Sequence, residues 1–356
     1  ESAPQRGASF DEPPRETRLF GDPDLELEGV EGNEDSQADE SGGGRPQLDD
    51  PQVVTLADRL HAAGWEIIPH SATPLRDTRE QTREALSYFR RYGARSWIDH
   101  QPYTNCEALV NQGYQAGRYG ITDLLSQHGY RYAWSGIDMP PGDLNLLAPR
   151  RLERYIPVVW PAGRLAQNTP EGPWLFRSML AFIETQRFFE VYSSDALDRL
   201  ERERGLHIAH TYLENSHPPR SWFGKRNLMV AGPRPREVIP DPRLTTLFSG
   251  LSARVVRGSL WVPTLTRLGD YLRGTAGVSV SLESDGSAVL RSSTAVNGMT
   301  LVIPRPFVQV RVDGQPPRGL RVSDGETTFW VNLQPDQPVR IQLRGPTGQP
   351  LSFLQP

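Results

Sequence analysis

Cysteine, lysine and long apolar runs are all scarce in this chain. Its 356 residues include one cysteine, Cys106, which excludes an intramolecular disulfide and leaves the cellular compartment open. No run of about 18 apolar residues occurs, so we expect no membrane-spanning helix. Lys225 is the only lysine, and the arginines that carry the remaining positive charge are scattered. Because nucleic-acid interfaces cluster their basic residues, we expect no nucleic-acid partner.

Glycine and proline are abundant, with 32 residues of each, which indicates many turns rather than a helical bundle. The hydrophobic content of 37% can support a core, and the length suits one large domain followed by a smaller one. The first residues show no charged-then-apolar leader. We therefore expect either a cytosolic chain or one whose leader has been removed.

Negative charge is concentrated at the start of the chain. Residues 1–50 contain 15 Asp or Glu and four Arg, whereas the remainder has 28 acidic and 35 basic residues. Residues 21–50 are also rich in glycine and poor in aromatics, so we expect an acidic mobile segment there. The body of the chain is mildly basic, which weakly favours an anionic polymer as partner.

Helical and strand patterns alternate between residues 51 and 275. Such alternation is typical of an α/β fold with a parallel sheet or barrel. The periodicity, the N-cap residue Thr78 and terminal glycines such as Gly93 define the expected elements. Helices are expected at 54–61, 78–92, 121–128, 195–204, 244–251 and 265–272, and strands at 65–68, 94–98, 130–134 and 206–209.

The pattern changes after Gly274, where short segments alternate apolar and polar residues. Asp-Gly or Asn-Gly pairs, the residues that favour tight turns, separate several of them. We therefore expect a small antiparallel β-sandwich over 276–356, after a first domain over 1–275. Its strands are expected at 278–282, 300–303, 308–312, 328–331 and 339–343.

Three histidines follow short apolar segments at wide spacing. His70 follows Ile67-Ile68-Pro69, His100 follows Trp97-Ile98-Asp99, and His210 follows Ile208-Ala209. In a βα fold these positions are the carboxyl ends of strands, where active sites of βα barrels are built. The three histidines therefore predict a hydrolytic or metal-dependent site. Each could instead be a structural residue at a strand end, and His61, His128 and His217 are expected at the surface.

The order of five motifs resembles the polysaccharide deacetylase family, also known as the NodB-homology domain or carbohydrate esterase family four. The resemblance covers about residues 1–275. The motifs, in order, are Ser9-Phe10-Asp11-Glu12-Pro13, His70-Ser71-Ala72-Thr73-Pro74, His100-Gln101-Pro102-Tyr103, Trp134-Ser135-Gly136-Ile137-Asp138 and Leu206-His207-Ile208-Ala209-His210. The family fold is a distorted (β/α) barrel, and its activity is metal-dependent removal of acetyl groups from a polysaccharide.

The resemblance implies a role for each matching residue. Asp11 would be the catalytic base and His210 the acid that protonates the leaving group. Glu12, His70 and His100 would bind a divalent metal, zinc or a similar ion. Tyr103, Trp134 and Asp138 would contact the substrate, with the backbone N–H of Tyr103 contributing to an oxyanion hole. The implied partner is a polysaccharide or cell-envelope glycan, which places the protein outside the cell or in the periplasm.

Pro74 departs from the family pattern in a way that leaves two functions open. It occupies the position of the second metal histidine, and its side chain has no metal-binding atom. A replacement ligand would have to come from His100 or Asp77. The alternative is a degenerate deacetylase-like protein that binds a glycan or a partner protein without hydrolysis. Trp65, Trp97, Trp134 and Trp160 either line a sugar-binding cleft or belong to the core.

Overall fold

The computed structural model describes most of the chain from residue 50 onward. Residues 55–356 form one compact unit, separate from residues 1–54. Residues 21–49 of the expected acidic segment, 21–50, lie outside the described residues, as do the candidate residues Asp11, Glu12, His100 and Tyr103. The described ranges are 50–72, 77–99, 105–115, 117–139, 144–147, 158–161, 172–180, 185–211, 228–234, 238–305, 309–323, 325–345, 348–351 and 353.

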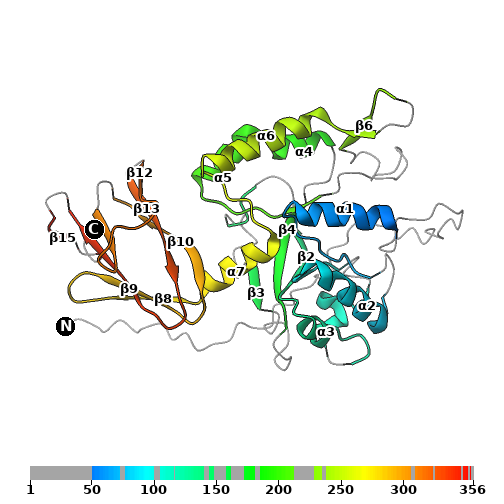
Figure 1. The fold of residues 1–356 in the computed structure, drawn as a ribbon, viewed down its shortest axis with the longest axis horizontal. Coiled ribbons are helices and arrows are strands. Elements are labelled where there is room, and N and C mark those ends of the chain that lie inside the picture. Colours follow the sequence, from blue (N-terminus) through cyan, green and yellow to red (C-terminus); the bar gives the residue numbers. More distant parts are fainter. Residues whose placement is uncertain are drawn as a thin grey trace, which may run out of the picture. The chain divides into compact units, whose positions relative to one another are not determined.

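A parallel sheet that curls into a half-barrel carries the first part of the fold (Figure 1). Strands β1 (Ser96–Trp97), β2 (Tyr132–Met139), β4 (Trp174–Leu180) and β5 (Ala209–His210) pair in chain order, each parallel to the next. Strand β3 (Val159–Pro161) pairs antiparallel with β4. The expected mixed α/β class is therefore confirmed, and the described residues form half of a barrel rather than a closed one.

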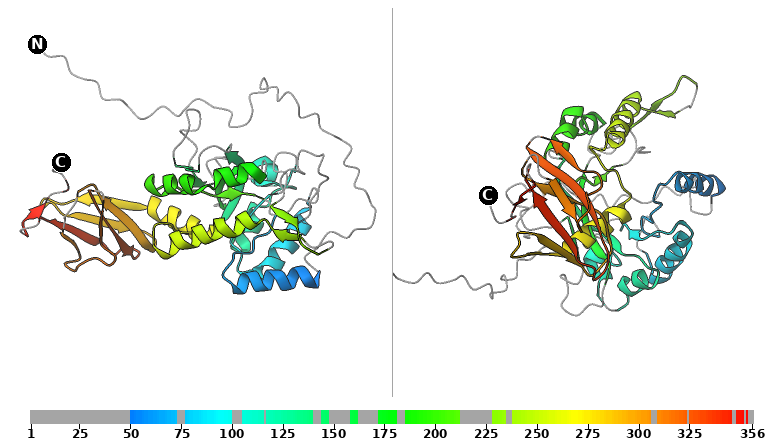
Figure 2. Two further views of the ribbon diagram at one scale, coloured as in Figure 1. Left: turned by 90° about the horizontal axis from the view of Figure 1, so that it is seen from above. Right: turned by 60° about the vertical axis from the view of Figure 1, so that its left-hand side comes forward.

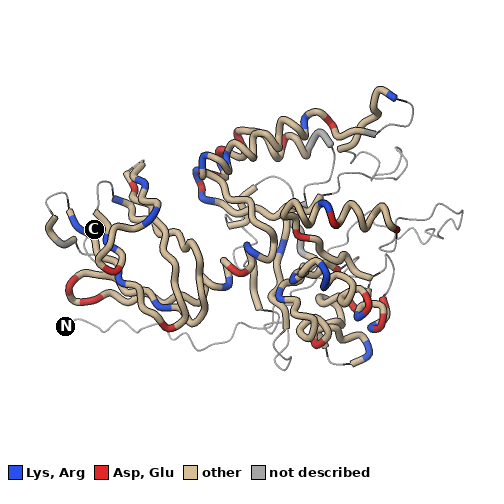
Figure 3. The backbone as a smooth tube through the Cα atoms, viewed as in Figure 1, with Lys and Arg blue, Asp and Glu red and all other residues tan. Residues whose placement is uncertain are grey.

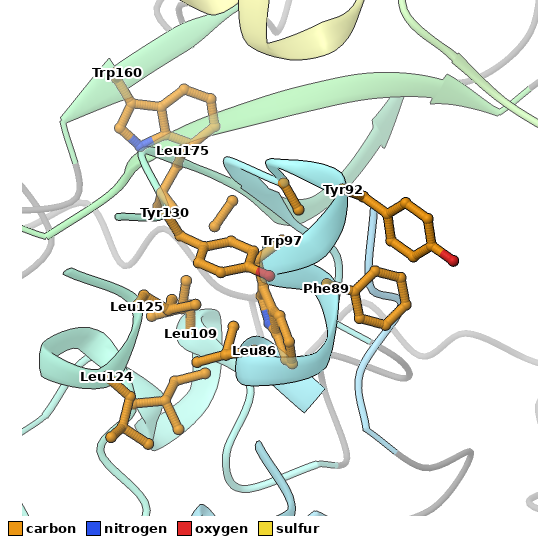
Figure 4. Packing of buried hydrophobic residues seen from close by; sticks show 13 residues of the cluster. Leu86, Phe89, Tyr92, Trp97, Leu109, Leu124, Leu125, Tyr130, Trp160 and Leu175 are labelled. Carbon is orange, nitrogen blue, oxygen red and sulfur yellow. The ribbon is translucent and has the colours of Figure 1, made fainter. Parts of the chain in front are cut away.

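Two helices, α2 (Arg79–Phe89) and α3 (Thr122–Gln127), pack on the outer face of this sheet (Figures 1 and 2). Helix α2 begins where expected, because Thr78 and Gln81 form a reciprocal capping box. A 3-10 turn, Arg90–Tyr92, extends it to Gly93, whose φ of 63° ends the helical segment. The buried cluster between helices and sheet is shown in Figure 4 and includes Leu86, Phe89, Trp97, Leu124, Leu125, Tyr130 and Leu175.

A second group of helices follows β4. Helices α4 (Thr185–Val191) and α5 (Ser194–Arg202) precede β5, and α6 (Pro242–Val256) lies beside them (Figures 1 and 2). The hairpin of β6 (Met229–Ala231) and β7 (Val238–Pro240) leads into α6. Helix α1 (Pro51–Ala62) opens the described chain. No helix in the described ranges is long and apolar enough to cross a membrane.

Helix α7 (Leu265–Ala276) lies close against the amino end of the sheet. Gly269 permits this approach, because a Cβ atom there would meet the Tyr132 ring at 2.5 Å. The Glu66 carboxylate accepts hydrogen bonds from the Thr266 backbone N–H at 2.9 Å and from the Thr266 and Ser96 hydroxyls. Glu66 therefore joins the first residue of β1 to the first turn of α7.

Two antiparallel sheets, here called the C-terminal sheets, follow α7 with a shared core. One sheet has the order β11-β14-β9-β8 with β15 beside β14, and the other has the order β10-β13-β12. Their bounds are β8 (Val278–Leu282), β9 (Ala288–Ser292), β10 (Val296–Ile303), β11 (Gln309–Val312), β12 (Arg321–Ser323), β13 (Glu326–Leu333), β14 (Val339–Arg344) and β15 (Pro350–Leu351).

Three of the four Asp-Gly or Asn-Gly glycines in these sheets lie in turns, and the fourth, Gly298, lies within a strand. Gly286, Gly314 and Gly325 adopt positive φ values of 79°, 78° and 81° between strands, as turn glycines should. Gly298 also has a positive φ, 69°, but it lies inside β10. The pairing of β10 with β13 shifts register between Val296 and Met299, so Asn297-Gly298 forms a β-bulge and not a turn.

Candidate functional site

The carboxyl ends of five neighbouring parallel segments lie along one edge of the half-barrel: the segment that ends at His70, then β1, β2, β4 and β5. His70 forms a parallel bridge with Ile98, directly beyond β1, and Leu180 at the end of β4 pairs with His210 at the end of β5. Asp138, near the end of β2, pairs with Ser178. This edge therefore gathers residues that are up to 140 positions apart in the sequence, as the barrel interpretation expected.

The inner face of the sheet is the face turned away from α2 and α3. It carries the buried cluster of Tyr132, Trp134 and Phe176, against which Ile98 and Ile208 pack. Residues paired across neighbouring strands share a face, so His70 lies on the inner face with Ile98. His210 is two residues beyond Ile208 and shares its face. The structure thus brings the two described candidate histidines to the same face and the same end.

His210 packs against Trp134 on this face. Their ring centroids lie 5.1 Å apart at an interplanar angle of 73°, an edge-to-face contact. The Trp134 indole N–H donates to the Ser178 hydroxyl at 2.8 Å, which fixes the indole plane. Trp134 is only 8% exposed, so it forms a wall beside His210 and not an open stacking platform. Trp97 and Trp160 are also core residues, whereas Trp65 is 61% exposed.

His70 stands at a sharp change of backbone direction. Its side chain is exposed, and the next residue, Ser71, is buried with a φ of 57°. Left-handed backbone is costly for a residue with a side chain and is concentrated at functional sites. The Ser71 N–H donates to the Ile98 carbonyl at 2.8 Å, and the Ala72 N–H donates to Asp77 at 2.7 Å. These bonds hold His70 at the strand end.

Two buried carboxylates, Asp77 and Asp99, support this edge, each with 2% exposure. Asp99 accepts hydrogen bonds from the Trp97 indole N–H at 2.6 Å and from the Leu109 backbone N–H at 2.9 Å. Burial raises the pKa of Asp99 to about 7; the two donors oppose this rise, and the charge of Asp77 adds to it. Asp99 therefore anchors Leu109 to the end of β1.

Asp99 was missed as a site residue by the sequence interpretation, although it has the same signal as the histidines. It directly follows the apolar end of a strand, one position before His100. A charged residue at the carboxyl end of a barrel strand is typical of a functional edge. The sequence analysis considered Asp77 only as a replacement metal ligand. In the structure its carboxylate accepts a hydrogen bond from the backbone N–H of Ala72.

The predicted metal site cannot be assembled from the described residues. Of Glu12, His70 and His100, only His70 lies in the described ranges. Within those ranges, no three His, Cys, Asp or Glu side chains come together to hold a metal ion. Pro74 also lies outside them. The ligand set, like the roles of Asp11 and Tyr103, stays a prediction.

The described residues place His70 and His210 at the end of an inner face that carries the buried aromatic cluster of Tyr132, Trp134 and Phe176. Ser178 is buried near the end of β4 and shares the inner face with Trp134, to which it is bonded. Arg177 belongs to the opposite face, where its guanidinium donates to the Leu146 carbonyl at 2.7 Å. An imidazole beside a fixed indole can donate a proton to a leaving group while the indole limits access of water. Comparison of the chain with protein families, with curated proteins and with solved structures finds no match.

Proposed function

We propose that this protein removes acetyl groups from a polysaccharide, at the carboxyl end of the half-barrel. The observation that carries the proposal is the placement of His70 and His210 on the same face and at the same end of one parallel sheet. The motif order of the sequence predicts the same two histidines as site residues. In this proposal the half-barrel belongs to a distorted (β/α) barrel of the deacetylase type.

His210 would act as the general acid of the reaction. Its half-buried imidazole lies against Trp134, so its position is fixed before the substrate arrives. Hydrolysis of an acetyl amide or ester needs a proton on the departing nitrogen or oxygen. A ring at the open edge of the sheet can deliver that proton, and Ser178 holds the neighbouring indole in place.

The divalent metal belongs to the proposal only through the resemblance. His70 alone does not make a metal centre. Metal analysis of the purified full chain tests this part directly. A stoichiometric divalent ion that is lost in His70→Ala supports the ligand role, and absence of any ion from the unmodified protein contradicts it.

Acetate release tests the function. The full chain is incubated with acetylated chitin oligosaccharides and with acetylated xylan, with and without added zinc. We expect acetate from one of them, and a loss of at least about a hundredfold in His210→Ala, the size typical of a lost general acid. His128→Ala is the matched control, because His128 lies at the end of α3 and outside the site. Equal rates in both variants would contradict the role of His210.

A second function, glycan binding without hydrolysis, is favoured by one observation. Pro74 occupies the position of the family's second metal histidine, and its side chain has no metal-binding atom. Under this alternative the oligosaccharides bind, no acetate appears at any metal concentration, and His210→Ala weakens binding but changes no rate. The acetate assay and a binding titration on the same samples separate the two functions.

A further inference from the structure

A pocket of about 520 Å³ lies at the amino end of the half-barrel, the end opposite His70 and His210. Its lining includes Arg131, Trp261, Arg267, Asp270, Tyr271 and Arg273, and residues 294–297 form its other side. Arg131 directly precedes β2, and the Arg273 guanidinium stacks 5.5 Å from the ring of Trp174, the first residue of β4. The pocket is therefore distinct from the candidate site, and its volume is that of a ligand site.

The pocket has an excess of positive charge. Arg131 and Asp270 form a two-pronged ion pair with N···O distances of 2.8 and 2.9 Å, and Asp270 also accepts the Tyr132 hydroxyl at 2.7 Å. Both carboxylate oxygens of Asp270 therefore already have partners, and its charge is balanced by Arg131. Arg267 and Arg273 form no ion pair within the described ranges, and their guanidinium groups lie over the rings of Trp261 and Trp174. Two exposed guanidinium groups are thus left facing the pocket, and guanidinium binds carboxylates in a two-pronged geometry.

An exposed aromatic surface stands beside these arginines. Trp261 is 48% exposed, and Tyr271 supports it edge-on with ring centroids 5.5 Å apart. The Arg267 guanidinium lies 5.9 Å from the Trp261 ring. A half-exposed indole held in one orientation offers a flat apolar surface with little loss of conformational freedom on binding. Such a surface suits the apolar face of a sugar ring.

We propose that this pocket binds an acidic carbohydrate, a polymer whose sugar units carry carboxylates. The sugar ring stacks on Trp261, and its carboxylate is bound by Arg267 and Arg273. The choice of a carbohydrate rests on the proposed function, which the pocket deepens by selecting an anionic polysaccharide. The excess of basic residues in the chain beyond residue 50 agrees with an anionic partner.

The same chemistry argues against a nucleic acid at this pocket. Nucleic-acid affinity comes from many phosphate contacts along an extended basic surface. Here two arginines are unpaired, and Lys and Arg are distributed over the backbone without forming a band (Figure 3). A small pocket with two guanidinium groups and one indole fits one or two acidic sugar units.

Titration calorimetry of the full chain with a hexamer of galacturonic acid tests the proposal. The matched ligand is the same hexamer with its carboxylates reduced to alcohols. We expect the acidic hexamer to bind at least about tenfold more tightly, the effect of a charge-assisted hydrogen-bonded contact. Equal binding of the two hexamers would overturn the proposal. Polyphosphate or single-stranded RNA that binds as tightly as the acidic hexamer would overturn it too, by indicating a general anion site.

Variants then locate the binding. Arg267→Gln, Arg273→Gln and Trp261→Ala should each weaken hexamer binding about tenfold, while Trp261→Phe retains most of the affinity. Arg118→Gln and Trp65→Ala are the controls, because Arg118 also stacks on an aromatic ring and Trp65 is also exposed, yet neither lines the pocket. Circular dichroism confirms that each variant is folded. Unchanged affinity in the pocket variants would overturn the assignment.

These experiments test the deacetylase proposal and the pocket proposal independently of each other. Acetate release is measured on a neutral acetylated oligosaccharide, which needs no carboxylate contact. Hexamer binding without acetate release would remove the deacetylase and keep the pocket. Acetate release without hexamer binding would remove the pocket and keep the deacetylase.

Discussion

The Nε2 atom of His207 lies 2.6 Å from the hydroxyl oxygen of Tyr192. On the other side of the ring, Nδ1 lies 3.0 Å from the Leu144 carbonyl oxygen. A carbonyl only accepts, so Nδ1 carries the proton and Nε2 accepts from the tyrosine hydroxyl. The neutral imidazole therefore satisfies both contacts, and burial lowers the pKa of His207 to about 4, although the bond to Leu144 opposes that change.

This arrangement predicts an acid-sensitive stability. Below pH 6.5 the unfolded chain protonates His207 and the folded chain does not, until the pH reaches about 4. Its contribution to the free energy of unfolding should fall by about 1.4 kcal/mol per pH unit in that window. Urea unfolding of the full chain and of His207→Gln, at pH 7, 6, 5 and 4.5, measures the difference in slope. Identical slopes would show that His207 is not the responsible group.

Replacement of Asp99 should destabilise the protein without unfolding it. In Asp99→Ala, the Trp97 indole N–H and the Leu109 backbone N–H lose their acceptor in a buried setting. We expect the free energy of unfolding to fall by about 2–4 kcal/mol, the cost of one or two buried unpaired donors. Asp195→Ala, an exposed carboxylate in the first turn of α5, is the control and should lose about 0.5 kcal/mol. A similar loss in both variants would refute the anchoring role.

Substitution by alanine at two helix glycines should change the free energy of unfolding in opposite directions. Gly250 lies inside α6 with nothing within 4 Å of an added Cβ, so Gly250→Ala should stabilise the protein by about 1 kcal/mol. At Gly269 an added Cβ would meet the Tyr132 ring at 2.5 Å, so Gly269→Ala should destabilise it by about 1–3 kcal/mol. Chemical unfolding of both variants measures the pair. Stabilisation by Gly269→Ala would mean that α7 does not pack on Tyr132 as described.

Arg254 in the last turn of α6 and Arg257, the C-cap residue of that helix, contact the same carboxylate but differ in burial. Arg254 is 8% exposed at its side chain, contacts Asp198 and Glu201 of α5, and donates to the Ser194 carbonyl at 3.2 Å. Arg257 is 50% exposed and contacts the same Glu201 at 3.3 Å. We expect Arg254→Ala to cost about 3–5 kcal/mol, because it leaves carboxylates without their buried partner. Arg257→Ala should cost less than about 1 kcal/mol. Thermal and urea unfolding would detect the contrast, and equal losses would contradict it.

Local chemistry explains why many elements were predictable from the sequence. Thr78 and Gln81 cap α2 from within four residues of each other, and Gly93 ends the following turn, so no distant contact is needed to place this segment. In the C-terminal sheets, strands β9, β12 and the two-residue β15 were missed. Strand β9 is buried on both faces at its start, so it lacks the alternation that reveals a strand, and β12 is three exposed residues.

The site was less predictable because its members come from separate strands. The approach of His210 to Trp134 depends on β2, β4 and β5 lying side by side, which no local pattern encodes. Trp134 was expected to contact substrate, yet its indole is buried and bonded to Ser178. Burial depends on what packs from the other elements, so an aromatic residue alone does not distinguish a core position from a binding surface.

The bond between Glu66 and Thr266 has a consequence for synthesis of the chain on the ribosome. The two residues are 200 positions apart. The carboxylate of Glu66 therefore has no backbone partner until the start of α7 has left the ribosome. Contacts of such long sequence separation slow folding, since the intervening chain must close as a loop. A nascent chain halted before residue 265 should therefore expose the amino end of the half-barrel to proteases, and release of the next dozen residues should protect it.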